Sequence, residues 1–361
     1  MNNLDHINPI IKLTDGCNYN CYFCRYANHT RKDVGIDERL IVKMVSESIC
    51  FNREHGKNKI NVIFHGGEPL LYGAKRLLAV IEEIQQKKDD DFIVDYSIQT
   101  NGSLITDDWV DIFKKYHFDV GISLDGPVLL NEHWYGDRNK SVEEVVGKYH
   151  MLRDNGVRCG ILSVVTNKHL LHLNEFFDFF VENKIDSIGL CFCYSKSDDY
   201  NVNPSQLGEW LIQLYDLYFN SPYKINIREF DNATKRVIKN YKKLCESLCR
   251  TNCGSYLTVH PDGRVDFCDD YEKNVEYPLG NINESSLYDI LGGTQYKTER
   301  LNAFSIVEEK CEFCEVKCIC RGGCARNDLC GHNYFCDTYK KIYPYIQENV
   351  LNYIANRKID I

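Results

Sequence analysis

Short apolar stretches alternate with helical patterns along the first two-thirds of the chain. Six stretches rich in β-branched and aromatic residues are expected to be strands, at 9–14, 59–64, 92–98, 118–124, 157–165 and 186–193. Between them, apolar residues recur at three- and four-residue steps, as in 40–49 and 77–84, which predicts amphipathic helices. Repeated strand–helix units predict an α/β fold with a parallel sheet. Six units are too few for a complete eight-stranded barrel, so an open doubly wound sheet and a partial barrel both fit.

The pattern changes after about residue 200. Helices are expected near 205–219 and 230–244, followed by a cysteine-rich region in which short strands flank a Pro-Asp-Gly turn at 261–263. We therefore expect two domains, 1–235 and 236–361, without a low-complexity linker between them. One further helix, in 141–156, has a predicted capping box of Ser141 and Glu144, and Gly156 is its predicted stop signal.

Four polar or glycine-rich motifs follow the first four predicted strands. Cys17 to Cys24 follow the first strand, HGGEP (65–69) the second, QTNG (99–102) the third and DGP (125–127) the fourth. Active-site groups of parallel α/β folds lie on the loops after the carboxyl ends of strands. We expect these motifs to share one edge of the sheet.

Charge and composition exclude several classes of protein. The 361 residues carry a net charge of -9, with 43% hydrophobic residues, as expected for a globular chain rather than a disordered one. An acidic chain is a poor partner for nucleic acid or anionic lipid, so no nucleic-acid or membrane partner is expected. The first residues lack the pattern of a signal peptide, and no apolar run has the length of a bilayer span, so a cytoplasmic location is expected.

The 18 cysteines are unevenly placed, with seven before Cys245 and eleven from Cys245 to Cys336. In a large chain without a signal peptide, this density favours thiolate ligands for metal over disulfides. Soft thiolates favour zinc or iron–sulfur clusters.

Cys17, Cys21 and Cys24 form a C-x3-C-x2-C motif with three thiols, whereas a closed site takes four. A cubane cluster held by three thiolates leaves its fourth iron free to bind a substrate or cofactor. The alternatives are that three cysteines fall together in a loop by chance, or that a fourth ligand elsewhere completes a zinc site.

The motifs CNYNCYFC and GGEP resemble those of the radical S-adenosylmethionine (SAM) superfamily in residue type, spacing and order. The resemblance implies a partial (β/α)6 TIM barrel whose cluster binds SAM through its open iron. The reduced cluster would cleave SAM to methionine and a 5′-deoxyadenosyl radical, which abstracts hydrogen from an unactivated position. A flavodoxin- or ferredoxin-type protein is the implied electron donor.

The same resemblance assigns roles around SAM. Gly66 and Gly67 allow a close approach of the backbone to a ligand, and Glu68 offers a carboxylate to its ammonium group. Phe23 is implied to lie near the adenine, Gly67 near the methionine end, and Ser123 and Arg138 near the ribose and carboxylate. The position of Arg138 is inferred across an insertion. A tight turn is the plain alternative for the two glycines.

The cysteine-rich region resembles a SPASM domain, which carries two auxiliary [4Fe–4S] clusters, so that three clusters are implied in all. The first auxiliary cluster is implied to take Cys253, Cys268, Cys324 and an upstream residue, Cys249 in preference to Cys245. The second is implied to take Cys311, Cys314, Cys320 and Cys336, with Cys330 as the rival to Cys336. A zinc ribbon is the alternative for C-x2-C. Cys318 is surplus, and four further cysteines are expected to be small buried hydrophobic residues: Cys50, Cys159, Cys191 and Cys193.

SPASM-bearing enzymes mostly modify peptides, so the resemblance implies a maturase that crosslinks a side chain of a ribosomally made precursor peptide. The rival is an anaerobic sulfatase maturase, which forms formylglycine from Cys or Ser. Asp269 matches the proton acceptor of the rival group, although an exposed turn aspartate is the plain alternative. His65 resembles the crosslinking branch, because sulfatase maturases typically have Gln there.

The first strand is expected near residue 9, which leaves no room before it for a leader-recognition domain. Another surface or a separate leader-recognition protein would have to bind the leader. An iron–sulfur electron carrier is the alternative outside enzymes, but it has no use for a SAM-type open site.

Overall fold

The computed structural model of the chain describes residues 4–21, 23–24, 35–131, 138–194, 200–239, 252–269, 278–329 and 332–357. The chain forms two compact units, and each is described by itself. The first comprises Met1–Leu124, Asn131–Gly160 and Gly254–Leu301, and the second comprises Asp125–Leu130, Ile161–Cys253 and Asn302–Ile361. The domain boundary expected near residue 235 stays a prediction.

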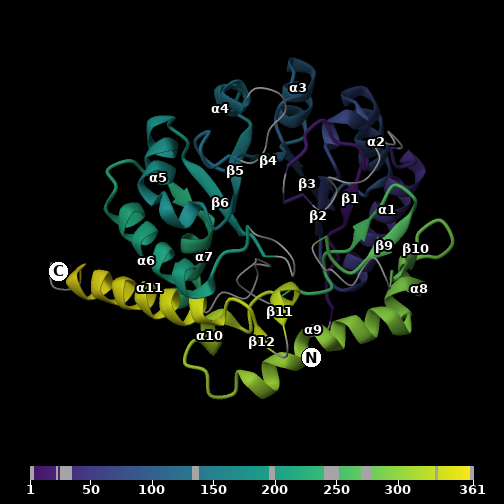
Figure 1. Ribbon diagram of the computed structural model, residues 1–361. Coiled ribbons are helices and arrows are strands. Elements are labelled where there is room, and N and C mark those ends of the chain that lie inside the picture. The colour runs from purple at the N-terminus through teal and green to yellow at the C-terminus, as the bar shows by residue number, and fades with distance from the viewer. Residues whose placement is uncertain are drawn as a thin grey trace. The chain divides into compact units, whose positions relative to one another are not determined.

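The first unit contains a mixed sheet with parallel strands at its centre (Figure 1). Its strands lie in the order β10-β9-β8-β1-β2-β3-β4. Strands β1 to β4 pair in parallel and β8 joins β1 in parallel, whereas β8, β9 and β10 pair antiparallel. Their bounds are β1 (Ile10–Lys12), β2 (Lys59–His65), β3 (Ile93–Thr100), β4 (Asp119–Ser123), β8 (Thr258–Val259), β9 (Arg264–Asp266) and β10 (Gly280–Asn281).

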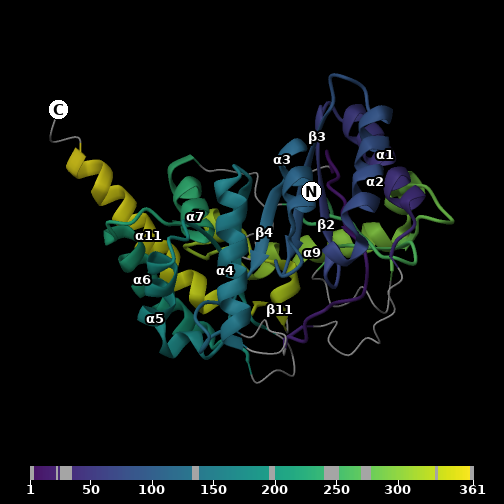
Figure 2. The same cartoon turned by 90° about the horizontal axis from the view of Figure 1, so that it is seen from above.

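Helices cover the outer face of this sheet, and α1 and α2 lie side by side in both ribbon views (Figures 1 and 2). The helices are α1 (Glu38–Glu54), η1 (Pro69–Tyr72), α2 (Ala74–Lys87), α3 (Asp107–Lys115), α4 (Arg138–Asp154), α8 (Leu287–Gly292) and α9 (Thr294–Lys310), the last of which continues into the second unit.

Strict alternation along the strands explains the core of the first unit. On β2, Ile60, Val62 and Phe64 are buried, while the residues between them are half-buried and face the other side of the sheet. The ring of Phe64 stacks against Phe118 and against Tyr96, with 6.1 Å between ring centroids in each pair. This aromatic layer fixes the register in which the polar strand ends meet.

The second unit combines parallel strands with a helical layer. Strand β5 (Arg158–Val165), which begins in the first unit, pairs with β6 (Ser187–Phe192), and β6 pairs with β7 (Asn226–Ile227). Helix α11 (Cys336–Arg357) lies along α6 (Pro204–Asn220), where Thr338 donates to the Pro204 carbonyl at 2.6 Å. The other elements are η2 (His169–Leu171), α5 (Leu173–Glu182), α7 (Arg228–Lys239), α10 (Lys317–Cys320), η4 (Ala325–Asn327), β11 (Asp328–Leu329) and β12 (His332–Asn333).

The six predicted strands are present, and their ends lie within two residues of the expected positions. The expected α/β class with a parallel sheet is confirmed. The predicted capping box was wrong, because α4 begins at Arg138 and places Ser141 inside the helix as a buried residue. The stop signal was right: Gly156 has φ +75°, and the next amide, of Val157, bonds to the Leu152 carbonyl at 3.0 Å.

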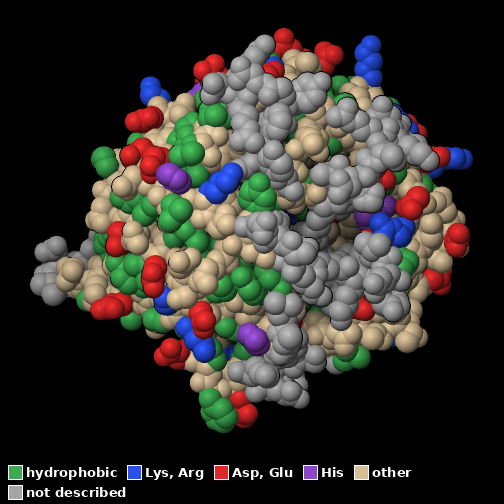
Figure 3. All heavy atoms as spheres, in the orientation of Figure 1, with side chains coloured by type: hydrophobic (Ala, Val, Ile, Leu, Met, Phe, Trp, Pro, Cys, Tyr) green, Lys and Arg blue, Asp and Glu red, His purple; other side chains and the backbone are tan. Residues whose placement is uncertain are grey.

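Surface charge is mixed on the face shown in Figure 3, where Lys and Arg side chains of the described residues are scattered among Asp and Glu. No helix in the described part of the chain is long and apolar enough to cross a membrane.

Candidate functional site

The segment with Cys17, Cys21 and Cys24 follows β1, and all three side chains are half-buried, as is Phe23. The C-x2-C part closes as a turn, in which the Cys24 amide bonds to the Cys21 carbonyl at 3.1 Å. Burial is the main reason that the pKa of Cys17 rises to about 11, and the charges of Glu68, Cys21 and Cys24 act in the same direction. A group of thiolates here is therefore unfavourable without a cationic partner.

Residues 66–68 run against the start of the cysteine segment. The Gly67 amide bonds to the Thr14 carbonyl at 2.8 Å, and the Glu68 amide bonds to the Gly16 carbonyl at 2.7 Å. A Cβ on Gly67 would lie 2.2 Å from the Gly16 carbonyl oxygen, and Gly66 has φ +151°. Both glycines are therefore required by close backbone packing, which is more than an ordinary turn demands.

Glu68 is 1% exposed, and its carboxylate already has protein partners. Oε1 accepts from the Leu70 amide at 2.9 Å and the Thr100 hydroxyl at 2.7 Å, and Oε2 accepts from the Asn101 amide at 2.8 Å. The carboxylate thus ties the end of β2 to the end of β3. Its predicted contact with the ammonium group of a ligand stays a prediction.

The sequence predicts QTNG at this edge but no role for its residues. In the structure, Asn101 Nδ2 donates to Asn18 Oδ1 at 2.8 Å, and Asn18 Nδ2 donates to the Ser103 hydroxyl at 2.9 Å. Asn18 lies between Cys17 and Cys21 in the chain, so this amide pair links the cysteine segment to β3. The signal that could have found it is an Asn after each of two strands, β1 and β3, that flank β2 in the sheet.

Two further predicted SAM contacts lie at the ends of β4 and α4. Ser123 is half-buried at the end of β4, where its hydroxyl accepts from Gln99 Nε2 at 2.9 Å. Gln99 fits there because Gly121 has no side chain; a Cβ would lie 2.1 Å from Gln99 Oε1. Arg138 is the first residue of α4, but its side chain lies outside the described residues.

Asp269 is not an exposed turn aspartate. Its Oδ1 lies 2.5 Å from Nζ of Lys12, which is 1% exposed, and its Oδ2 lies 3.8 Å from Nε2 of His65. Lys12 and His65 are register partners on β1 and β2, so all three side chains meet where these strands end. Burial alone would raise the pKa of Asp269, but the charges of Lys12 and His65 outweigh it and hold this pKa below its ordinary value. Lys12 was not predicted from the sequence, since a lysine inside an apolar strand has no motif around it.

In the second unit, four cysteines line one cavity of about 660 Å³: Cys311, Cys314, Cys320 and Cys336. These are the thiols assigned to the second auxiliary cluster. The Cys314 amide bonds to the Cys311 carbonyl at 3.2 Å, which repeats the turn at Cys21 and Cys24. The assignment itself stays a prediction.

A sharp turn separates Cys320 from Cys324. Arg321, Gly322 and Gly323 have φ values of 53°, 86° and 67°, three successive left-handed residues. A Cβ on Gly323 would lie 2.7 Å from Cε2 of Tyr339. The turn carries Cys324 away from Cys320, and Cys324 is not among the residues that line the cavity.

The remaining predicted ligands have varied placements. Cys253 is the last residue of the segment Ile161–Cys253 of the second unit, whereas Cys268 follows β9 in the first unit. Three cysteines lie outside the described residues: Cys249, its alternative Cys245, and Cys330, the rival to Cys336. Among the described residues, no group of three or more His, Cys, Asp or Glu side chains is placed to hold a single metal ion.

Two of the four cysteines expected to be buried are buried, namely Cys159 and Cys193, and Cys191 is half-buried. The expectation for Cys50 was wrong, because it lies on the outer side of α1 and is exposed.

Two known families match this chain, one over the segment with Cys17, Cys21 and Cys24 and one over part of the cysteine-rich region. Residues 11–180 match the radical SAM superfamily, and residues 249–319 match the SPASM iron–sulfur cluster-binding domain. The chain therefore contains a radical SAM domain followed by a SPASM domain, and the expected fold class is confirmed.

Among characterised relatives, the chain is similar to anaerobic sulfatase-maturating enzymes. It is 27% identical to the cysteine-type enzyme of Clostridium novyi, over 95% of each chain. It is 24% identical to the serine-type enzyme of Klebsiella aerogenes, over 91% of this chain and 82% of that one.

Solved structures share the fold. The structure of anSMEcpe with bound AdoMet has a TM-score of 0.82 at 23% identity, covering 97% of this chain and 99% of that one. Streptococcus suis SuiB bound to its precursor peptide SuiA has a TM-score of 0.62 at 18% identity, covering 89% and 72%.

Proposed function

We propose that this enzyme oxidises a side chain of a ribosomally made peptide to form a crosslink, using SAM and three [4Fe–4S] clusters. The observation that carries the oxidation of a side chain is the pair of Lys12 and Asp269, 2.5 Å apart beside His65 and directly after Cys268. A half-buried carboxylate that a lysine holds ionised is in the protonation state needed to accept a proton from a substrate.

The residues present fit the proposed cofactors. Four thiols around one cavity have the donor set of a closed cubane cluster, and Cys17, Cys21 and Cys24 have the set of an open one. We assign Cys253, Cys268, Cys324 and Cys249 to the remaining cluster. When bound, SAM and the open cluster supply the radical that abstracts a hydrogen atom.

The chain's own residues complete the oxidation. The substrate would lose a hydrogen atom from carbon, a proton to Asp269 and one electron, which an auxiliary cluster held by the predicted cysteines would accept, so that two hydrogens are lost overall. Lys12 keeps Asp269 deprotonated before the proton arrives and stays beside it afterwards. Gly67 would lie near the methionine end of SAM, with Gly66 beside it, and Phe23, Ser123 and Arg138 are assigned to the rest of it.

Formylglycine formation is the second candidate, since it is a two-electron oxidation that needs the same proton acceptor. Similarity to sulfatase maturases along 95% of the chain supports it. His65, in place of the glutamine typical of that group, supports the crosslink. SAM is bound in the anSMEcpe structure, and a precursor peptide in the SuiB structure.

Two partners follow from this proposal. A flavodoxin- or ferredoxin-type donor would supply the electron that reduces the open cluster. A separate protein, or a surface of this chain outside the barrel, would bind the leader of the peptide.

The test is anaerobic incubation of the reconstituted enzyme with SAM, reductant and a candidate peptide, followed by mass spectrometry. Loss of two hydrogens with crosslinked fragments supports the first candidate. Conversion of one Cys or Ser to an aldehyde supports the second. Absence of 5′-deoxyadenosine under strong reductant would refute both.

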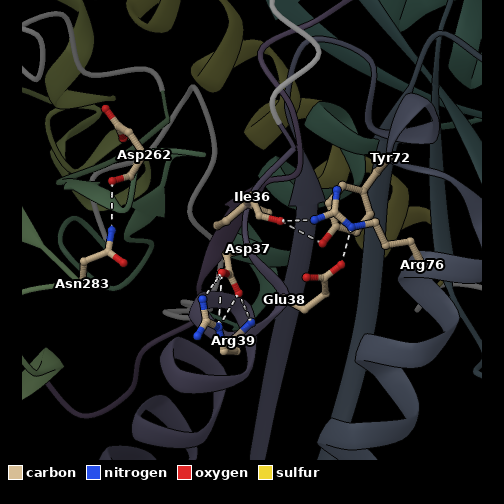
Figure 4. Close-up of polar contacts among 8 residues, drawn as sticks. All are labelled: Ile36, Asp37, Glu38, Arg39, Tyr72, Arg76, Asp262 and Asn283. Atoms are coloured by element: carbon tan, nitrogen blue, oxygen red, sulfur yellow. Dashed lines mark hydrogen bonds and ion pairs between the residues drawn. The ribbon is translucent and has the colours of Figure 1, made fainter.

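Asp269→Asn tests the proton acceptor. We expect cleavage of SAM to continue while peptide modification falls about 100-fold or more, because general-base catalysis contributes factors of this size. Asp262→Asn is the matched control, as Asp262 is exposed on the turn of the same hairpin and its carbonyl accepts from Asn283 at 3.1 Å (Figure 4). Equal loss in both variants, or none in Asp269→Asn, would remove Asp269 from the mechanism.

A further inference from the structure

A clamp around Arg76 holds the chain where it returns from the cysteine segment (Figure 4). Arg76, on α2, donates from Nη2 to the Ile36 carbonyl at 3.0 Å and from Nε to the Glu38 carboxylate. Its guanidinium lies over the ring of Tyr72, 4.1 Å from the centroid. We call Arg76, Tyr72 and Glu38, with the Ile36 carbonyl, the Arg76 clamp.

Tyr72 gives the clamp a second bond to the same carbonyl, because its hydroxyl donates to Ile36 O at 3.0 Å. Tyr72 is 6% exposed, so this bond is shielded from water. It is also the last residue of η1, which starts at Pro69 directly after Glu68. The clamp therefore joins the residues after the GGE motif to the residues before α1.

Gly35 shows how closely the chain passes the clamp. A Cβ at this position would lie 2.6 Å from Nη1 of Arg76 and 2.9 Å from Cδ2 of Tyr72. Gly35 also bridges to Thr14, and the Ile36 amide bonds to the Leu13 carbonyl at 2.9 Å. The two ends of the segment that carries the cysteines are thus held together at its base.

The same base is held from the other side by the GGE motif, through the bonds from Gly67 to Thr14 and from Glu68 to Gly16. Thr14, two residues after β1, therefore contacts both Gly35 and the GGE motif. The clamp binds Ile36, where the chain continues after the cysteine segment, to η1, which directly follows the GGE motif.

Stability of the fold is a weak explanation for this arrangement. Arg76 and Glu38 are 38% and 41% exposed, and ion pairs of that exposure contribute little. Two donors on the Ile36 carbonyl and the close passage of Gly35 instead fix how near the two segments lie to each other. The clamp is better explained by a need to fix the distance between two segments.

We propose that Arg76 is a positioning residue that presets the cysteine segment against the GGE motif, and so sets the affinity for SAM. This rests on the proposed function, in which the two segments hold the open cluster and the methionine end of SAM. Affinity falls in proportion to the fraction of protein in the competent arrangement. If Arg76→Ala lowers the fraction of protein in the competent arrangement about fivefold to tenfold, we expect SAM binding to weaken by the same factor.

The experiment uses the full chain reconstituted anaerobically, with equilibrium dialysis of SAM and the EPR change of the reduced open cluster on SAM addition. Lys87→Ala is the matched control, because Lys87 is on the same helix and pairs only at the surface with Glu83, 2.6 Å away. We expect unchanged SAM affinity in the control. Arg76→Lys, which keeps the charge but not the two-pronged donor, should fall between wild type and Arg76→Ala.

Tyr72→Phe keeps the ring and removes only the bond to Ile36, so it tests the clamp if Arg76→Ala does not fold. A smaller loss of SAM affinity in the same direction, with iron content unchanged, supports the proposal. Unchanged affinity in both variants, with or without a lower Tm, refutes it. If wild-type protein neither binds nor cleaves SAM, the proposed function fails instead.

Discussion

The same cysteine turn occurs twice in the molecule, in different surroundings. Cys21 and Cys24 close C-x2-C through a 3.1 Å backbone bond, and Cys311 and Cys314 close theirs through one of 3.2 Å. Around the second turn, Cys320 and Cys336 line the same cavity and complete a set of four thiols. Around the first turn there is one further thiol, that of Cys17, and the backbone of the GGE motif packs beside it.

The turn alone therefore does not define the kind of site. A C-x2-C motif presents two thiolates in either region, and the number of further thiols decides whether a cluster is closed or keeps an open iron. In the first region, glycine serves close backbone approach, since Gly67 lies against Gly16. In the second, Gly322 and Gly323 adopt a left-handed backbone, which turns the chain between Cys320 and Cys324.

The largest effect is expected from removing the first turn. In the Cys21→Ala, Cys24→Ala double variant, we expect complete loss of 5′-deoxyadenosine formation, because the open cluster has only one thiol left. The auxiliary clusters should keep their EPR signals. Chromatography of the SAM products and anaerobic EPR measure the two outcomes.

Cys50→Ala is the control for that variant, because Cys50 is an exposed thiol on α1 and should leave both outcomes unchanged. Retained SAM cleavage in the double variant would show that the two regions do not differ as described. An iron–sulfur carrier without SAM chemistry would show no product even in the wild type.

Sequence patterns predicted the strands well because their alternation records which face is buried. They also placed Cys17, the GGE motif and QTNG at one edge, since parallel strands end together. They did not find Lys12 or the Arg76 clamp, because these depend on contacts between residues far apart in the chain.

Two local predictions failed for a related reason. Ser141 with Glu144 has the sequence of a capping box, but the helix gains another turn before it and buries the serine. Cys50 is apolar by type, yet it falls on the outer side of α1. In both cases, the position of the whole helix on the sheet overrides the preference of one residue.

A smaller effect is expected from Glu68, the buried carboxylate of the first region. Burial raises its pKa from 4.5 to about 7, while the bonds from Asn101, Thr100 and Leu70 oppose this rise. Between these values, the folded protein holds a proton that the unfolded chain releases, so the free energy of unfolding falls as pH rises through this window.

Glu68→Gln removes this titration. We therefore expect the stability of wild type relative to Glu68→Gln to decrease by about 2 kcal/mol between about pH 5 and about pH 8. Thermal unfolding of both proteins across this range measures the difference. Parallel pH profiles would mean that Glu68 is ionised throughout and that its three donors outweigh burial.

The smallest effect is expected from Asn333, in the second region. Asn333 is 3% exposed and lines the cavity, and its Nδ2 donates to the Cys324 carbonyl at 2.7 Å. Its backbone is also hydrogen-bonded to the Cys336 thiol, which lowers the pKa of that thiol against the rise caused by burial. Hydrogen bonds to cluster sulfurs stabilise the reduced state. The side chain of Asn333, through its bond to Cys324, thus fixes the backbone donor that lies beside the predicted ligand Cys336.

In Asn333→Ala, we expect the potential of the second auxiliary cluster to become more negative by about 40 mV, the equivalent of roughly 1 kcal/mol for one hydrogen bond in a one-electron couple. Anaerobic redox titration followed by EPR measures it. Asn349→Ala is the control, since Asn349 also donates from Nδ2 to a carbonyl, that of Tyr345 at 2.9 Å, but farther along α11. A shift of equal size in both variants would mean that the Asn333 side chain has no specific effect on the potential of this cluster. A shift confined to Asn333→Ala would show that a backbone donor supports the second cysteine turn, as the amides of Gly67 and Glu68 support the segment that carries the first.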